Sequence, residues 1–441
     1  MAIDEGRGCP GPDARAVLNG VLSVLRDRRT LERSPNCYPP YQLNISLVHE
    51  ELQRLRVFGV TGRQIDFRMS PGAIQSSFAI PCSGNGRCQL PPTGDNRAVI
   101  DAFCHIIPPK YEAVRWTRAG SSDFAAGSPA HLQYVRTGKK APNYEVLTSL
   151  DARFRMMDEF DNYTQILSLA SPPPEHIAPN ASVELARIAN DELAEHVAKY
   201  PERFAGAAAA VPMNEPDHAC HEIERATEQL GLCAVQIYSN VNGRALDAPD
   251  FRPVFEMLAT RHVPILLHPA RARTHADYTT EADSRYLIWQ VFGWPYESTA
   301  AMMRLVFSGI MQEHPDLKIL VHHTGAMIPF FHGRMKSMFD MFAEDLQLQA
   351  EGRLTRHPLE YFKQFYGDTG AFSAGAMNVA RDFFGADHLL FGSDAPFDAA
   401  GGRSCIRESI AAVENSSCSA VEKQKIFTTN VEQFFGLVMG V

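Results

Sequence analysis

The chain has 441 residues, of which 45% are hydrophobic, a formal net charge of −9 at pH 7 and a sequence pI of about 6.0. This acidic balance offers no basic footprint for nucleic acid, and no apolar run is long enough to cross a bilayer. Nine scattered cysteines without a C-x-x-C pair are typical of reduced thiols, so we expect a cytoplasmic protein without nucleic-acid or membrane partners.

The first 97 residues differ from the rest of the chain. Turn-forming residues separate two expected helices from short strand-like pieces, with the helices at Asp13 to Arg33 and Asn44 to Arg56. The segment from Pro91 to Asp95 is typical of a linker. We therefore expect residues 1–97 to be an N-terminal extension, and no motif in it indicates a role.

From Ala98 onward, short apolar runs alternate with longer helical patterns. The expected strands, apolar on both faces as in a buried parallel sheet, are Ala98–Cys104, Thr164–Leu169, Phe204–Val211, Leu232–Tyr238, Pro264–His268, Lys318–His322, Phe365–Asp368 and Leu389–Ser393. Expected helices include Val183–Tyr200, Phe251–Arg261, Ala300–Glu313, Ala374–Phe384 and Ala420–Phe435. Eight strand–helix repeats predict that residues 98–441 form an α/β fold, a (β/α)₈ TIM barrel. Long insertions are expected at Pro108 to Asn143 and Pro269 to Ser298, after strand ends.

Four polar residues fall at or just past the ends of these strands: His105, His268, His323 and Asp394. The carboxyl ends of barrel strands converge on one mouth, where barrel enzymes build their active sites. One histidine at a strand end is usually a hydrogen-bonded core residue, but four such residues at corresponding ends indicate a common site. Imidazoles with a carboxylate suit a divalent metal such as zinc or manganese, with one position open for water or substrate.

The sequence around these residues resembles that of the amidohydrolase-related decarboxylases, a group that includes aminocarboxymuconate-semialdehyde, resorcylate and carboxyvanillate decarboxylases. The matching segments are Leu389–Phe397, Leu317–Pro329, Ile265–Pro269, Val235–Leu246, Trp294–Ser298 and Asp368-Thr369. The resemblance covers roughly Ala98 to the C-terminus. It implies that His105, His268 and Asp394 are metal ligands, and that His323, placed by its spacing to Gly325 and Pro329, is the catalytic acid/base. His322 is then expected to be a hydrogen-bonded core residue.

One position departs from the family pattern. The family begins its first strand with Asp-x-His-x-His or with a glutamate ligand, whereas this chain has Phe103 where the first ligand belongs. Cys104 is expected on the opposite face of the strand, since side chains alternate, unless the strand bulges. Three interpretations stay open: a metal held by the three remaining ligands, a metal-free site in which His323 and Asp394 act as a direct acid/base pair, or a barrel without catalytic activity.

The resemblance implies a decarboxylase that acts on a small unsaturated or aromatic carboxylic acid. Such a reaction needs a proton donor, for which histidine is suited, and cationic groups that hold the carboxylate. We expect Arg244, Arg271 and Arg273 to bind the substrate, with Phe103 and Trp294 in the pocket wall. A metal-independent hydrolase, lactonase or hydratase is the alternative within enzymes. The family also implies a homodimer.

Overall fold

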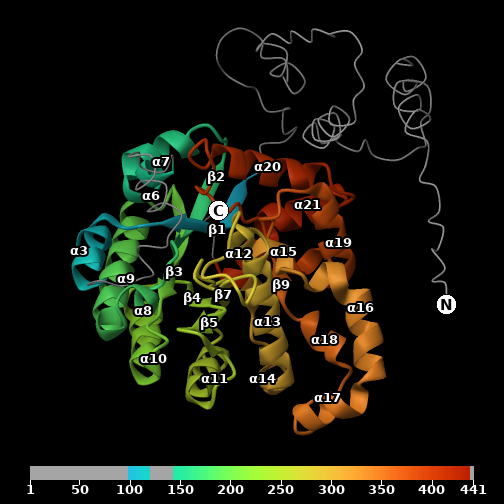
Figure 1. Cartoon of the computed structure of the whole chain (residues 1–441). Helices are drawn as coiled ribbons and strands as arrows, with labels where there is room; N and C mark the ends of the chain where they lie inside the picture. Colours follow the sequence, from blue (N-terminus) through green and yellow to red (C-terminus); the bar gives the residue numbers. More distant parts are fainter. Residues whose placement is uncertain (1–97, 120–142, 438–441) are drawn as a thin grey trace, which may run out of the picture. The chain divides into compact units, whose positions relative to one another are not determined.

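The computed structural model describes residues 98–119 and 143–437 (Figure 1). The predictions for residues 1–97 lie outside this part of the chain, as does most of the expected insertion between Pro108 and Asn143. Within the described ranges, no helix is both long and apolar enough to cross a membrane. The cysteines of these ranges, Cys104, Cys220, Cys233, Cys405 and Cys418, are free thiols.

Seven parallel strands form one sheet in the order β1-β2-β3-β4-β7-β8-β9. The strands are β1 Val99–Ile106, β2 Tyr163–Leu169, β3 Phe204–Ala210, β4 Ala234–Tyr238, β7 Ile265–His268, β8 Ile319–Val321 and β9 Tyr366–Gly367. A small antiparallel hairpin, β5 Asn240–Val241 with β6 Arg244–Ala245, follows β4. Seven of the eight predicted strands are thus confirmed, and their order along the sheet is that of a barrel.

The eighth predicted strand, Leu389–Ser393, is not a regular strand, but it closes the sheet. Leu390 N donates to Gly367 O of β9 (3.0 Å), and Ala102 N of β1 donates to Phe391 O (2.8 Å). At the next two residues side chains replace ladder partners, before Asp394 N again donates to Phe103 O of β1 (3.0 Å). Gly392 N donates to the Thr369 hydroxyl (3.1 Å), and Ser393 N donates to Asp101 (2.9 Å). The prediction of a strand was wrong here because side-chain partners at Gly392 and Ser393 interrupt the backbone pairing.

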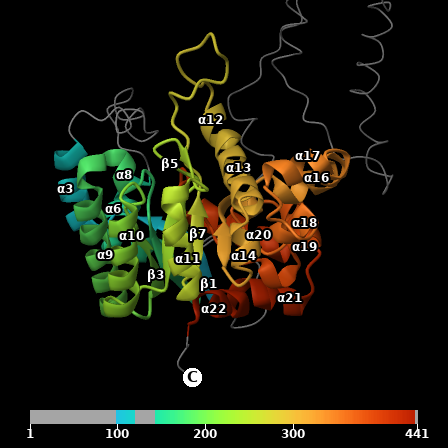
Figure 2. The same cartoon turned by 90° about the horizontal axis from the view of Figure 1, so that it is seen from below.

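Helices cover the outside of the sheet (Figures 1 and 2). They are α3 Pro109–Ala119, α6 Tyr144–Thr148, α7 Leu150–Met157, α8 Pro174–Ile177, α9 Ser182–Lys199, α10 Pro216–Glu224, α11 Arg252–Thr260, α12 Ile288–Val291, α13 Gly293–Phe307, α14 Ile310–Glu313, α15 His322–Gly325, α16 Ile328–Met341, α17 Ala343–Gln349, α18 Pro358–Phe362, α19 Ala374–Phe384, α20 Arg403–Glu414, α21 Ala420–Gln424 and α22 Asn430–Phe435. The helices predicted at 183–200, 251–261 and 374–384 correspond to α9, α11 and α19.

Two other expectations need correction. The helix expected over 300–313 begins earlier and breaks between α13 and α14 at Gly309, whose φ of +86° is the left-handed region that favours glycine. The expected insertion after β1 begins with a helix, α3. The Glu192 carboxylate on α9 accepts hydrogen bonds from Lys110 N and Tyr111 N at the start of α3. A cap supplied from so far along the chain leaves no local sequence signal.

The interior of the barrel is divided along its axis. Apolar side chains from successive strands, among them Ile100, Ala102, Ile166, Ala208, Leu266 and Leu320, form a closed cluster inside the sheet. Polar side chains gather above them, at the carboxyl ends of the strands. The segment after β7 (yellow) projects beyond that end in Figure 2 before it returns through α12 and α13. This upper layer contains the candidate site.

Candidate active site at the barrel mouth

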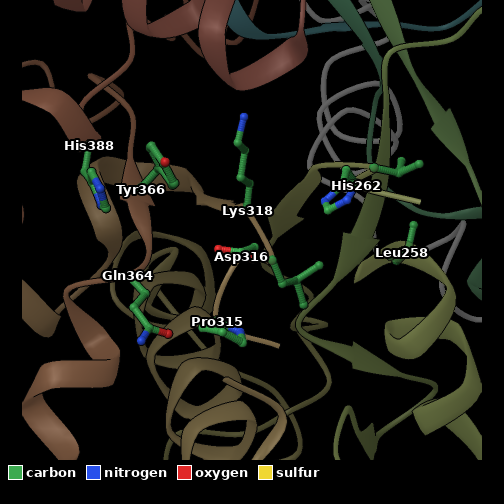
Figure 3. Close-up of a pocket in the computed structure, with 10 residues that line it drawn as sticks. Leu258, His262, Pro315, Asp316, Lys318, Gln364, Tyr366 and His388 are labelled. Atoms are coloured by element: carbon green, nitrogen blue, oxygen red, sulfur yellow. The ribbon is translucent and has the colours of Figure 1, made fainter. Parts of the chain in front are cut away.

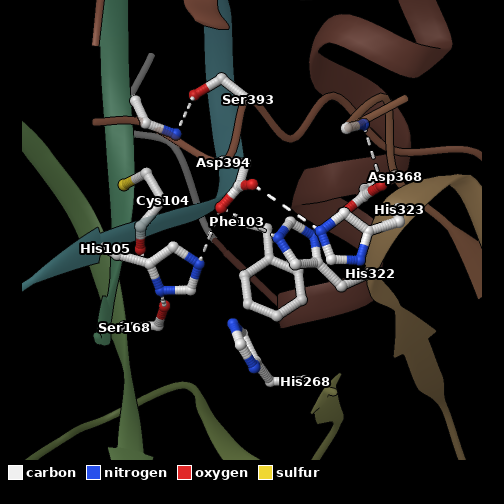
Figure 4. A network of polar contacts seen from close by, with 12 residues as sticks. Phe103, Cys104, His105, Ser168, His268, His322, His323, Asp368, Ser393 and Asp394 are labelled. Atoms are coloured by element: carbon white, nitrogen blue, oxygen red, sulfur yellow. Dashed lines mark hydrogen bonds and ion pairs between the residues drawn. The ribbon is translucent and has the colours of Figure 1, made fainter. Parts of the chain in front are cut away.

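Asp394 lies at the centre of a group of imidazoles (Figure 4). His105 Nε2 lies 3.4 Å from Asp394 Oδ1, and His322 Nε2 lies 3.2 Å from the same oxygen. His323 Nε2 lies 3.7 Å from Asp394 Oδ2. The ring of His268 lies 5.2 Å from that of His105 and 5.5 Å from that of His322. All four residues predicted from strand ends therefore meet, together with His322.

The three innermost imidazoles share one orientation. His268 Nδ1 donates to Pro269 O (2.7 Å), and His322 Nδ1 donates to the Asp368 carboxylate. Ser168 Oγ donates its only proton to Cys104 O, so it accepts from His105 Nδ1 at 3.0 Å. In each ring Nδ1 is held by an outer partner, and Nε2 is left to face the cluster. Such outer partners are what orient metal-binding histidines in proteins.

Burial and charge act in opposite directions here. Burial lowers the pKa of His105 and, with the neighbouring imidazoles, holds that of His268 well below its usual value. Burial also opposes a charge on His322, but Asp368 and Asp394 outweigh it and raise the pKa to about 10. For Asp394 burial would raise the pKa, yet the charge of His322 and the close approach of three imidazoles hold it well below the ordinary range. Asp394 is thus an anion among inward-facing nitrogens.

This donor set fits a divalent metal ion. Among the described residues, ligand atoms of His105, His268 and His322 lie within 4.8 Å of one another, as do those of His322, His323 and Asp394. His105 Nε2 and His322 Nε2 are buried and have no hydrogen-bond partner. An imidazole nitrogen that lacks a hydrogen-bond partner and faces a carboxylate needs a metal cation or a proton between itself and the carboxylate. Imidazole and carboxylate ligands suit zinc and manganese.

Phe103 lies beside the clustered imidazoles and contributes no ligand atom. Its ring is fully buried, 4.0 Å from the ring of His322 and 5.4 Å from that of His105. Strand β1 does bulge, since Asp101 pairs with Gln165 but Cys104 pairs with Leu167. The bulge nevertheless leaves the Cys104 thiol pointing away from the imidazoles, toward Ile166 O at 3.4 Å (Figure 4). The Cys104 thiol is therefore not placed to act as a metal ligand.

His323 differs from the inner imidazoles. Its side chain keeps 18% of its surface exposed, and its Nδ1 has no hydrogen-bond partner, while burial and the nearby His322 lower its pKa. Its φ is +58°, and Thr324, Gly325 and Ala326 also have positive φ, so α15 is a strained turn rather than a helix. Backbone strain of this kind, about 1–3 kcal/mol per residue, is found mainly at active sites.

The predicted substrate-binding residues do not all reach this cluster. Trp294 does, with its ring 5.6 Å from that of His268 and 6.3 Å from that of His323. Arg271 lies next to it, accepts from Trp294 Nε1 through its carbonyl, and pairs with Glu297 at 2.9 Å. Arg273 pairs with Asp283 at 2.7 Å.

Arg244 is half exposed on the β5–β6 hairpin. It pairs with Asp250 and lies over the Phe251 ring. Within the described ranges, each of the three arginines is therefore engaged by a carboxylate.

Three functional positions were missed by the sequence reasoning. His322 was expected to be a hydrogen-bonded core residue; it is buried, but only one of its nitrogens is bonded and the other faces Asp394. Asp368, which was noted only as part of a matching dipeptide, also accepts from Thr324 N (2.7 Å) and Gly370 N (2.9 Å). Phe397, 39% exposed, has its ring 5.4 Å from that of His105. The doubled histidine before Gly325 was the available signal for His322.

A separate cavity of about 460 Å³ lies elsewhere in the barrel, at the amino ends of β8 and β9 (Figure 3). Its lining includes Lys318, Tyr366 and His388. The Tyr366 and His388 rings are stacked with centroids 4.2 Å apart, and Lys318 donates to Gln433 O at 2.7 Å. None of the clustered histidines lines this cavity, so it is not part of the candidate site.

The chain resembles known proteins over most of the described region. A family model described as Amidohydrolase matches residues 100–437. The gamma-resorcylate decarboxylase of Polaromonas sp. is 32% identical over 296 residues, which cover 65% of this chain and 87% of that protein. The 2-amino-3-carboxymuconate-6-semialdehyde decarboxylase of Dictyostelium discoideum is 29% identical over 56% of this chain and 66% of that protein.

Solved structures of decarboxylases are also similar to this chain. The dihydroxybenzoic acid decarboxylase of Polaromonas sp., solved with bound manganese and the inhibitor 2-nitroresorcinol, superposes with a TM-score of 0.60 at 26% identity. It covers 78% of this chain and 98% of its own. The 5-carboxyvanillate decarboxylase of Sphingomonas paucimobilis shares the fold, with a TM-score of 0.64 at 23% identity over 77% of this chain and 99% of its own.

Proposed function

The chain belongs to the amidohydrolase family, and on that premise we propose that it is a metal-assisted decarboxylase of a small aromatic carboxylic acid. Several relatives are named gamma-resorcylate decarboxylase, and a related structure of a dihydroxybenzoic acid decarboxylase holds manganese. The observation that carries the proposal is the set of three imidazoles, His105, His268 and His322, whose ligand atoms lie within 4.8 Å of one another beside Asp394. Each of them is oriented by an outer hydrogen-bond acceptor. A site for acid/base chemistry alone would not need three such nitrogens.

The metal ligands in this proposal include His105, His268 and Asp394. Held by these residues, a divalent ion would supply positive charge for the substrate's carboxylate at the barrel mouth. This charge takes the place of the arginine clamp expected from the sequence, because Arg244, Arg271 and Arg273 are already paired with carboxylates. The aromatic ring of the substrate then lies against Trp294, which borders both His268 and His323.

His323 is the proton donor. It is the most exposed of the clustered imidazoles, so it is the one that a substrate can reach. Its imidazolium transfers a proton to the ring carbon that carries the carboxylate. The bond between that carbon and the carboxylate then breaks, carbon dioxide leaves, and the electron pair of the broken bond restores the aromatic ring. Asp394, 3.7 Å from Nε2, stabilises the imidazolium before transfer, and His323 recovers its proton from solvent.

The direct test is carbon dioxide release from a panel of hydroxybenzoates, beginning with 2,6-dihydroxybenzoate, a compound bound in a related solved structure. We expect release with manganese or zinc present and its loss after chelation. A matched panel of lactones tests the hydrolase alternative. Hydrolysis of a lactone without carbon dioxide release from any aromatic acid would overturn the proposal.

A further inference from the structure

The loss of the first-strand ligand at Phe103 raises the question of what replaces it. His322 lies immediately beside that position, since the two rings are 4.0 Å apart. It comes from the end of β8 rather than from β1, so sequence alignment to the first strand could not reveal it. The side chain is fully buried, and its Nε2 has no hydrogen-bond partner. A buried nitrogen of this kind requires a proton, a metal or another polar group.

The surroundings of His322 are those of a ligand. Its Nδ1 donates to Asp368, and the other carboxylate oxygen of Asp368 is held by Thr324 N and Gly370 N. A carboxylate fixed in this way fixes the tautomer and orientation of the imidazole, as in carboxylate–histidine–metal triads. His323 lacks such a partner on Nδ1 and is partly exposed. Of the two adjacent histidines, only His322 is preorganised.

The distances also fit. Ligand atoms of His105, His268 and His322 lie within 4.8 Å of one another, and Asp394 Oδ1 lies 3.2 Å from His322 Nε2 and 3.4 Å from His105 Nε2. In a tetrahedral zinc site with metal–nitrogen bonds of about 2.1 Å, two ligand nitrogens are about 3.4 Å apart. The separations of Asp394 from His105 and His322 match that spacing, and the ligand atom of His268 lies within 4.8 Å of both histidines.

We propose that His322 Nε2 has replaced the first-strand ligand, so that the metal is held by His105, His268, His322 and Asp394. This inference rests on the metal-binding part of the proposed function but not on decarboxylation itself. The ligand has moved from β1 to the end of β8, and Phe103 fills the space that the original side chain left. His323 remains free to exchange protons with a substrate.

The test counts imidazole nitrogens on manganese by pulsed electron paramagnetic resonance of the full chain. We expect three coordinated imidazoles in the wild type and two in His322→Ala at saturating manganese. The adjacent control, His323→Asn, should keep three. The double variant Phe103→His with His322→Ala should recover three, because it restores a ligand on β1.

Affinity gives a second readout if His322→Ala folds poorly. Asp368→Asn leaves the imidazole in place but removes the carboxylate that orients it, so manganese should bind about 10–100-fold more weakly. Two imidazoles in the wild type, an unchanged count in His322→Ala, or no manganese bound would overturn the inference. Carbon dioxide release measured on the same samples separates the two proposals. Metal bound through His322 without release refutes only the decarboxylase, and metal-dependent release with His322 uncoordinated refutes only the ligand assignment.

Discussion

The lower and upper layers of the barrel interior differ in what they contribute. The lower layer is apolar and closed, with Ile100, Ile166 and Leu320 at most 1% exposed. The upper layer contains buried nitrogens without partners, an anionic Asp394 and a run of left-handed backbone from His323 to Ala326. The first arrangement stabilises the fold, and the second costs stability. The upper layer is where we propose that the chemistry occurs.

The largest expected effect comes from the upper layer. His323→Asn removes the proposed proton donor while keeping a residue that tolerates a φ of +58°. We expect kcat/KM for decarboxylation to fall by about 10²–10⁴-fold, the usual contribution of a positioned acid, with little change in the melting temperature. Steady-state kinetics and thermal denaturation measure the two quantities. Full activity in this variant would place the proton donor elsewhere.

A substitution in the lower layer should have the reverse effect. Ile100→Ala removes buried apolar atoms five residues along β1 from His105. We expect the free energy of unfolding to fall by about 2–5 kcal/mol, while folded protein keeps its metal content and kcat. Denaturant titration and elemental analysis check this. Loss of metal from Ile100→Ala without a loss of stability would contradict the proposed difference between the two layers.

The buried carboxyl group of Glu175 allows the free-energy cost of burying a charge to be measured. This carboxyl, on α8, is 1% exposed, and burial raises its pKa from 4.5 to about 8. Between these values the folded state holds a proton that the unfolded state has lost, so stability should fall as pH rises from about 4.5 to about 8. Glu175→Gln should remove this dependence and raise the free energy of unfolding by a few kcal/mol at pH 8.5 relative to wild type. If the free energy of unfolding of the two proteins changed with pH in the same way, this prediction would be refuted.

The smallest effect is expected for Arg244→Ala. This arginine was predicted to bind substrate, but it is half exposed and pairs with Asp250 on the β5–β6 hairpin. Exposed ion pairs contribute about 0–1 kcal/mol, so the free energy of unfolding should change by no more than about 1 kcal/mol. We also expect KM for the aromatic acid to stay within about twofold of wild type, because Arg244 is paired with Asp250. A tenfold rise in KM would require the loss of about 1.4 kcal/mol of binding free energy. A large rise in KM would return Arg244 to the substrate site.

The sequence predicted most of this architecture because buried strands and amphipathic helices leave periodic patterns. Strand ends then placed His105, His268, His323 and Asp394 at one mouth. Features that depend on distant partners left no such pattern. The cap of α3 comes from Glu192, and the closing segment at Gly392 pairs with side chains.

The role of His322 was missed for a related reason. Whether a residue at a strand end belongs to the core or to the site is predicted from the side of the strand on which its side chain lies. The left-handed turn at His323 lets two successive imidazoles face the same carboxylate. A regular strand would have turned one of them away. The N-terminal extension over residues 1–97 and the homodimer stay predictions.

The most direct test is anomalous X-ray diffraction at the manganese or zinc absorption edge from crystals of the wild-type protein. We predict one peak at the barrel mouth, about 2.0–2.2 Å from donor atoms of His105, His268, His322 and Asp394. A peak bonded to His323 instead of His322, or metal-soaked crystals without a peak among these residues, would contradict the account.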